Sequence, residues 1–122
     1  MKQGKIKTAY EITEELSDDK TLSDKVLWAL YKTRKTLYPH YDFQRIRQRE
    51  IFQKYEGEVS SNDQLHFKNA ETAQKFADEV NSLSGMEVEL DNFTKQTISL
   101  KDFQGITIHQ IEALEDFIEF TE

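Results

Sequence analysis

The sequence predicts an α+β fold that is mostly helical. We expect an N-terminal helical hairpin, or a kinked long helix, packed with a small two- to three-stranded sheet and two further helices. Apolar residues recur at helical spacing through residues 8–56. Residues 58–120 combine short alternating segments, typical of half-buried strands, with two more helical patterns. Because the chain has only 122 residues, two separate cores would both be marginal, and we expect one domain over residues 1–122.

The first expected helix begins at Thr8. Thr8 and Glu11 have the spacing of a capping box, in which each side chain accepts a hydrogen bond from a backbone N–H of the first helical turn. Ala9, Ile12 and Leu16 then place apolar side chains on one helix face. Residues 17–20 break this spacing and predict a loop.

The second helical pattern is the longest, and Pro39 divides it. It begins at a second capping box that starts at Thr21 and continues to Tyr55. Proline lacks an N–H and collides with the preceding turn, which predicts a kink or an end at this position. An unbroken helix would extend about 50 Å, although a compact chain of this size is only about 35 Å across.

We therefore expect the chain to fold back near Pro39 into a helical hairpin. The alternative is a protruding arm that presents an apolar stripe to a partner, because a lone protein rarely leaves such a stripe in contact with water. That stripe would consist of Trp28, Tyr31, Phe43 and Phe52.

The C-terminal half mixes strands with helices. Alternation of apolar and polar residues predicts strands at residues 65–67, 87–90 and 97–100. Between the first two strands, a helix capped by Asn69 should end at Gly85. The last helix should begin with a capping box at Thr107 and continue through Phe117. Its expected inward side chains are Ile111, Leu114, Phe117 and Ile118, and its expected outward ones are Glu112, Glu115, Asp116 and Glu119.

Charge is distributed unevenly along the chain, whose formal net charge is −7. Residues 20–54 contain nine Lys or Arg and three Asp or Glu, a net charge of +6. Residues 55–122 contain four basic and fifteen acidic residues, a net charge of −11. The two segments can pair within the fold or across an assembly, or they can form ordinary solvated helix faces.

Composition argues against several classes of protein. No apolar run approaches the roughly 20 residues that a membrane-spanning helix needs, so we expect no membrane partner. The N-terminus lacks the apolar stretch of a signal peptide. The absence of cysteine excludes disulfides and thiolate sites, and is compatible with a cytoplasmic location.

The sequence contains no recognisable catalytic or metal-binding motif. His40, His66 and His109 lie far apart and lack a second ligand at metal-binding spacing. Neither a nucleophile motif nor a glycine-rich phosphate loop occurs. We therefore expect a protein that is not an enzyme, with no cofactor and no metal.

The segment 32–49 contains the best basic cluster in the chain. Its basic residues include Arg34, Arg45 and Arg49, a composition that suits contact with phosphate groups. The overall charge of −7 opposes binding to a polyanion. A nucleic-acid-binding accessory factor is therefore only an alternative hypothesis.

Two stretches resemble small uncharacterised proteins of tailed bacteriophages and prophages. In residues 23–57, a helical segment with a central proline ends in an aromatic and charged run before Lys-Tyr-Glu-Gly. In residues 87–119, an acidic strand and a second strand precede a helix that ends in Leu-Glu-Asp-Phe-Ile. The chain departs from the pattern at Glu56-Gly57-Glu58, and at Asp116, where the family usually has proline. No established activity comes with this resemblance, so it assigns no catalytic residue.

The resemblance implies a phage or prophage origin, and therefore a location in the host cytoplasm or in the virion. Phage proteins of this size often bind and inhibit a host factor, and others are virion accessory parts that form oligomers. We expect a protein partner, with homo-oligomerisation as a further option. The expected partner-binding residues are Trp28, Tyr31, Arg34, Tyr38, Phe43, Arg45, Arg49, Glu112, Glu115 and Glu119, since aromatic residues and arginine dominate binding hot spots.

Overall fold

The computed structural model describes residues 1–91 and 93–122. It confirms the expected α+β class with mostly helical content. In chain order, the elements are α1 (Gln3–Ser17), α2 (Asp24–Lys54), β1 (Glu58–Val59), β2 (Leu65–His66), α3 (Ala70–Ser84), β3 (Gln96–Ser99), the 3-10 turn η1 (Leu100–Asp102), α4 (Ile108–Leu114) and β4 (Ile118–Thr121).

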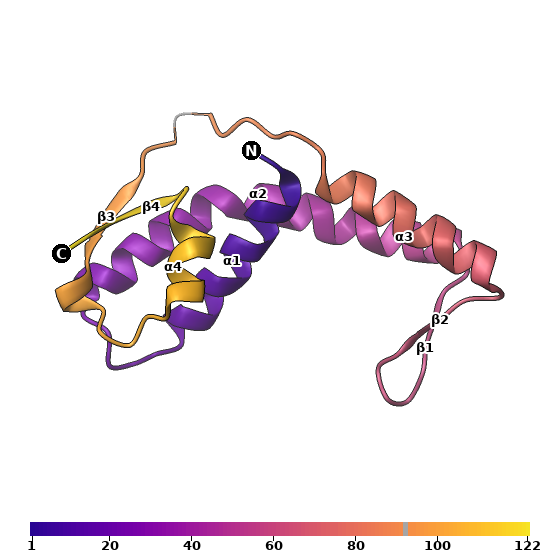
Figure 1. The fold of residues 1–122 in the computed structure, drawn as a ribbon, viewed down its shortest axis with the longest axis horizontal. Helices are drawn as coiled ribbons and strands as arrows, with labels where there is room; N and C mark the ends of the chain where they lie inside the picture. Colours follow the sequence, from indigo (N-terminus) through magenta and orange to yellow (C-terminus); the bar gives the residue numbers. More distant parts are fainter. Residues whose placement is uncertain (92) are drawn as a thin grey trace.

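Helix α2 is the longest element, and the other elements pack along it in two units (Figure 1). The first unit, called the body here, contains α1, the N-terminal half of α2, β3, η1, α4 and β4. The second unit, called the arm, is residues 45–84. It consists of the C-terminal part of α2, the β1–β2 hairpin and α3, which returns antiparallel to α2.

The expected fold-back at Pro39 is wrong, because α2 continues through this residue for 31 residues in all. The side of α2 opposite the exposed face is covered mainly by α1 in its first half and by α3 in its second. Both halves of the helix, which bends near its middle (Figure 1), therefore gain tertiary packing. Pro39 itself is exposed. The expected start at Thr21 is also wrong: the N-cap is Ser23, whose hydroxyl accepts a hydrogen bond from the Val26 N–H.

Helix α1 begins at Gln3, five residues before the expected cap. Thr8 lies within the helix, where its hydroxyl donates to the Gly4 carbonyl. The N-terminus is held by a β-bridge between Lys2 and Glu87, which supports the extra helical turn. The expected inward residues of α1 are nevertheless confirmed: Ala9, Ile12 and Leu16 are buried.

Within residues 1–91 and 93–122, four strands form two separate two-stranded sheets. Strands β1 and β2 pair antiparallel, whereas β3 and β4 pair in parallel, with Gln96 opposite Ile118. The expected strand at 65–67 is confirmed in shortened form as β2, and the one at 97–100 is confirmed as β3, shifted by one residue. The expected strand at 87–90 is wrong: only the Glu87 bridge to Lys2 forms. The cap of α3 at Asn69 and its end at Gly85 are confirmed.

The last helix begins with the expected capping box, formed by Thr107 and Gln110. It ends at Leu114 and not at Phe117, because the chain turns and β4 pairs with β3. The turn still directs Phe117 and Ile118 into the core, so the expected inward side chains are buried, except that Ile111 is half-buried.

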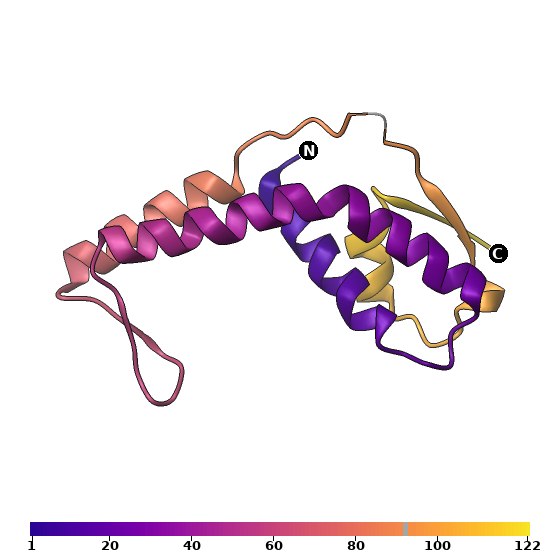
Figure 2. The same ribbon diagram turned by 180° about the vertical axis from the view of Figure 1, so that it is seen from behind.

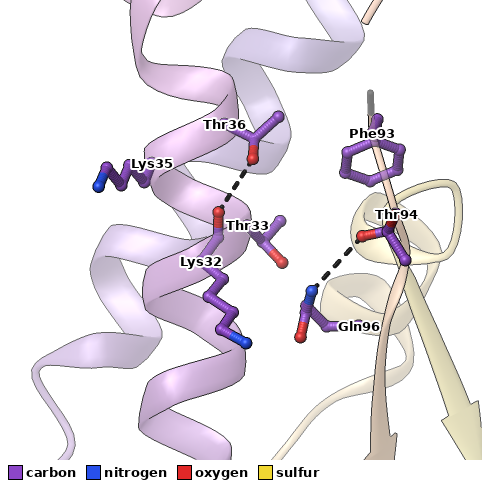
Figure 3. A pocket seen from close by; sticks show the side chains of 7 residues that line it. All are labelled: Lys32, Thr33, Lys35, Thr36, Phe93, Thr94 and Gln96. Carbon is purple, nitrogen blue, oxygen red and sulfur yellow. Dashed lines mark hydrogen bonds between the residues drawn. The ribbon is translucent and has the colours of Figure 1, made fainter. Parts of the chain in front are cut away.

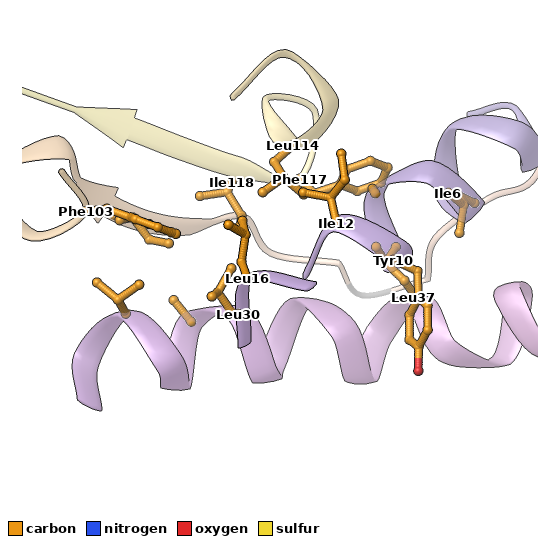
Figure 4. Close-up of a cluster of buried hydrophobic side chains, with 14 residues drawn as sticks. Ile6, Tyr10, Ile12, Leu16, Leu30, Leu37, Phe103, Leu114, Phe117 and Ile118 are labelled. Carbon is orange, nitrogen blue, oxygen red and sulfur yellow. The ribbon is translucent and has the colours of Figure 1, made fainter. Parts of the chain in front are cut away.

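The main hydrophobic core lies in the body, and none of its fourteen residues belongs to the arm (Figure 4). Figure 4 shows the labelled side chains between α2 and the layer formed by α1, α4 and the strands. The arm buries Ile51 and Leu83, and three phenylalanines contact one another at its end. In the part of the chain that the structure describes, no helix combines the length and apolar character needed to cross a membrane.

Candidate protein-binding surface

The outer face of α2 is defined here by five exposed side chains: Trp28, Tyr31, Tyr38, Phe43 and Ile46. At 3.6 residues per turn, they fall within an arc of about 140° on the side opposite Leu30, Leu37 and Ile51. Helices α1 and α3 pack mainly against the opposite side of α2, and at the edge of the arc Tyr10 of α1 contacts Tyr38. Figure 2 shows α2 in front of the other elements along its whole length, without a layer over it.

These side chains are exposed to an extent that is unusual for large apolar groups. Trp28 is 56% exposed, Tyr38 47%, Phe43 46%, Ile46 42% and Tyr31 41%. Five of the nine large apolar side chains that are exposed in the described residues therefore lie on one helix face. Large apolar side chains that gather on one exposed face mark an interaction site more often than single scattered ones do.

Aromatic contacts fix the rings of Trp28, Tyr31 and Tyr38 on this face in the free protein. The ring of Trp28 stacks on Tyr31, with centroids 5.4 Å apart and planes 20° apart. The Lys32 ammonium lies 5.1 Å from the Trp28 ring, within range of a cation–π contact. Tyr38 contacts Tyr10 at 5.8 Å, and Tyr10 stacks on Tyr41 at 4.1 Å. Burial raises the pKa of Tyr10 and of Tyr41, so both rings stay neutral at physiological pH.

Basic residues lie along and beside the outer face. Arg45 donates to Asp42 at 2.7 Å, and this hydrogen bond raises the pKa of the Arg45 guanidinium. Arg49 and Lys35 are exposed, whereas Arg34 is half-buried. Because Arg45 is already paired within its own helix, Lys35 and Arg49 are the more accessible positive charges for a partner.

A groove of about 360 Å³ lies beside α2, between this helix and the segment that leads into β3. It is lined by Lys32, Thr33, Lys35, Thr36, Phe93, Thr94 and Gln96. None of these lining residues, within the described part of the chain, is acidic. Figure 3 shows the Lys32 side chain extended along α2 on the Gln96 side, whereas Lys35 is directed away from Phe93 and Thr94.

The structure brings together only part of the predicted partner-binding set. Trp28, Tyr31, Arg34, Tyr38, Phe43, Arg45 and Arg49 all belong to α2. Glu112, Glu115 and Glu119 are exposed but belong to α4, its C-cap and β4. Since α4 lies on the other side of α2 from the outer face, one flat partner surface cannot contact both groups at once.

The basic and acidic halves of the chain make little direct contact. Among the ion pairs of the described residues, only Lys54–Glu79, at 2.7 Å, joins residues 20–54 to residues 55–122. The other pairs of the basic segment are local, as between Arg47 and Glu50 at 3.1 Å. Most of the positive charge of α2 is therefore not neutralised by the acidic half.

Two features of this surface were not expected from the sequence. Ile46 is not among the expected partner-binding residues, yet it is 42% exposed on the same helix face as Trp28. The groove depends on Phe93, Thr94 and Gln96, which are distant from α2 in the chain and carry no motif. The three histidines lie on or near different elements, and no group of three His, Cys, Asp or Glu in the described residues could hold a metal ion.

No protein-family model, curated protein or solved structure matches this chain. The resemblance to small phage and prophage proteins therefore stays a prediction.

Proposed function

We propose that this chain is a non-catalytic protein of phage or prophage type that binds a host protein and inhibits or modulates it. The outer face of α2 is the proposed docking surface. The observation that supports this proposal is the set of five large apolar side chains, each more than 40% exposed, on one uncovered helix face.

Energetic considerations agree with a docking role for this face. Tryptophan, tyrosine and arginine are enriched among the residues that dominate binding energy. The stacked pair of Trp28 and Tyr31 is ordered in the free protein, which lowers the entropy lost on binding. A helix of 31 residues offers a strip about 46 Å long and about 10 Å wide, or roughly 460 Å². This is less than the roughly 800 Å² per partner of a standard interface, so the partner must also contact surfaces beside α2.

The test of this proposal is removal of the two stacked rings. We expect Trp28→Ala combined with Tyr31→Ala to weaken binding to the host partner at least about 30-fold, because each ring is a hot-spot residue type. The wild-type protein first identifies the partner by affinity capture from a host lysate and mass spectrometry. Titration calorimetry with the purified partner then measures the affinity of each variant.

The matched control is Ile108→Ala, which removes a side chain that is 75% exposed and lies on α4, away from the outer face. This variant should bind the partner as tightly as the wild type. Equal affinity of the double variant and the wild type would exclude the outer face as the docking surface, provided that circular dichroism shows both to be folded.

Two other functions make different predictions. A virion accessory component would form a defined oligomer, which size-exclusion chromatography with light scattering detects, and a clean monomer would argue against it. A nucleic-acid-binding factor would use Arg34, Arg45 and Arg49, which share helix α2. It would bind an oligonucleotide at about 50 mM salt and lose affinity steeply as the salt concentration rises.

A further inference from the structure

We propose that the partner contributes an acidic amphipathic segment to this surface. Its apolar side chains lie on Trp28 and Tyr31, and one of its carboxylates enters the groove beside Lys32. This inference rests on the proposed function, since it names the chemistry of the partner at the same site.

The charge distribution favours an acidic partner. Residues 24–54 contain eight Lys or Arg and three Asp or Glu, a net charge of +5, and the remaining residues carry eight and twenty, a net charge of −12. Of the three acidic residues of α2, Asp42 and Glu50 are bound to arginines of the same helix, and Asp24 lies at the N-terminus of the helix. Exposed charges elsewhere on the protein are largely screened beyond about 10 Å at 0.1 M salt, so a segment lying on α2 experiences mainly the local positive charge.

The groove offers hydrogen-bond donors suited to a carboxylate. The hydroxyls of Thr33 and Thr36 donate to carbonyls of their own helix, at 2.9 and 3.1 Å, and are therefore occupied. The Lys32 ammonium, the Thr94 hydroxyl and the second N–H of the Gln96 amide remain as donors along the groove. Lys32 also contacts the Trp28 ring, so the groove and the aromatic pair form one continuous surface.

Other occupants fit less well. A second copy of the chain docked face to face would bring together two helices that each carry a net charge of +5, and like charges at an interface are unfavourable. A nucleic acid extends well beyond one groove and would meet the −12 charge of the remaining protein. A short acidic segment with apolar side chains can cover the exposed rings and also place carboxylates beside the lysine ammonium groups.

The single tryptophan of the chain, Trp28, makes a direct assay possible. Two synthetic peptides of about 20 residues, long enough to form a helix, carry leucine at the same helical positions and either glutamate or glutamine elsewhere. Trp28 fluorescence reports binding of each peptide. We expect the glutamate peptide to bind at least about tenfold more tightly than the glutamine peptide at about 50 mM salt, and this difference to shrink as added salt screens the charges.

Lys32→Glu should abolish the preference for the glutamate peptide. Lys20→Glu, which makes the same charge change in the exposed loop before α2, should retain it. Equal affinity for the two peptides, failure of both to bind, or retained preference in Lys32→Glu would overturn the inference. A tighter complex with a single-stranded oligonucleotide of about 20 nucleotides, or a stable dimer that buries Trp28, would also overturn it.

The inference and the proposed function can fail separately. If the double variant of Trp28 and Tyr31 loses the host partner while Lys32→Glu binds it normally, the docking surface stands and the acidic partner is excluded. If the double variant binds the host partner normally, the docking surface itself is excluded, whatever the peptides show.

Discussion

Gly57 lies where the chain leaves α2 and enters the β1–β2 hairpin, and its N–H donates to the Phe52 carbonyl at 2.9 Å. A Cβ at this position would lie 2.2 Å from the ring of Phe52. That ring is itself confined, because it packs edge-on against Phe67 at 5.8 Å and Phe76 at 6.0 Å. The absence of a side chain at Gly57 therefore lets the backbone pass close to the Phe52 ring as the chain leaves α2.

We predict that Gly57→Ala lowers the free energy of unfolding by about 1–3 kcal/mol, the usual cost of overpacking. Urea denaturation measures this change. Gly105→Ala is the control, since a Cβ at Gly105 would meet no atom within 4 Å, and it should change stability by no more than about 0.5 kcal/mol. Equal effects of the two substitutions would show that Phe52 can move aside.

Glu79 links α3 to the end of α2 and gives the arm a pH-dependent contact. Hydrogen bonds from Lys54 and from the Tyr55 hydroxyl lower the pKa of its carboxyl group below the ordinary value for glutamate. A lowered pKa in the folded state means that the carboxylate stabilises the fold above the ordinary pKa, and that this contribution disappears as the pH falls through the lowered value.

We therefore predict that stability falls more steeply in the wild type than in Glu79→Gln when the pH is lowered from about 6 to about 3. Urea denaturation at a series of pH values tests this difference. Parallel pH profiles for the two proteins would mean that the contact of Glu79 with Lys54 and Tyr55 does not persist in solution.

Single-residue patterns predicted some helix ends and not others. Asn69 and Thr107 cap helices as expected, since each has an extended backbone and a side chain that accepts a hydrogen bond from the backbone N–H three residues later. Thr8 has the same type of pattern but lies inside α1. Its position depends on the pairing of Lys2 with Glu87, which is remote in sequence. A capping pattern identifies a local option, and long-range contacts decide whether the chain uses it.

At the scale of single elements, α2 shows how packing overrides a local signal. Pro39 deprives the carbonyl of Lys35 of its usual donor, which in a helix interior costs about 3 kcal/mol. The helix persists because α1 and α3 contact it on either side of this position. The proline therefore remains as a local weakness in a helix that tertiary contacts maintain.

We predict that Pro39→Ala raises the free energy of unfolding by about 2 kcal/mol, since the restored hydrogen bond outweighs the greater freedom of the unfolded chain. Urea denaturation measures it, and Lys35→Ala, an exposed substitution one turn earlier, should be nearly neutral. A loss of stability in Pro39→Ala would instead assign a packing role to the proline ring.

The last segment of the chain shows a similar conflict between local pattern and pairing. The spacing of Leu114, Phe117 and Ile118 fits a helix, but residues 118–121 form β4 beside β3. Both arrangements bury Phe117 and Ile118, so burial alone does not distinguish them. The presence of β3, which offers backbone groups for pairing, decides in favour of the strand.

At the scale of the whole molecule, the two units differ in how much apolar surface they bury. The body contains the fourteen-residue core, whereas the arm buries Ile51 and Leu83 and relies on its aromatic cluster. Regions with few buried apolar contacts open at lower free energy than the main core. The arm should therefore unfold locally while the body remains folded.

We predict faster amide hydrogen exchange in residues 45–54 and 70–84 than in α1 and residues 26–37, measured by mass spectrometry or NMR on the intact protein. Comparing different parts of α2 provides an internal control, because both belong to one helix. Uniform protection along α2 would indicate that body and arm unfold as a single cooperative unit.

The sequence alone determined the mostly helical class, the approximate position of most elements, two of the helix caps and the separation of basic from acidic residues. These features depend on neighbours within a few positions in the chain, so local spacing and composition contain them. Trp28, Tyr31 and Phe43 were also expected on an exposed stripe, and the structure shows all three exposed, whereas Phe52 of the same expected stripe is half-buried.

Only the tertiary structure decided which face of α2 is buried. The helix has two apolar stripes, one through Leu30, Leu37 and Ile51 and one through Trp28 and Ile46. Helical periodicity alone does not show which of the two stripes is buried. Helices α1 and α3, together with β3, cover the first stripe, and the second stripe is left exposed as the outer face. The physical reason is that burial is a property of contacts between distant segments, which no local pattern specifies.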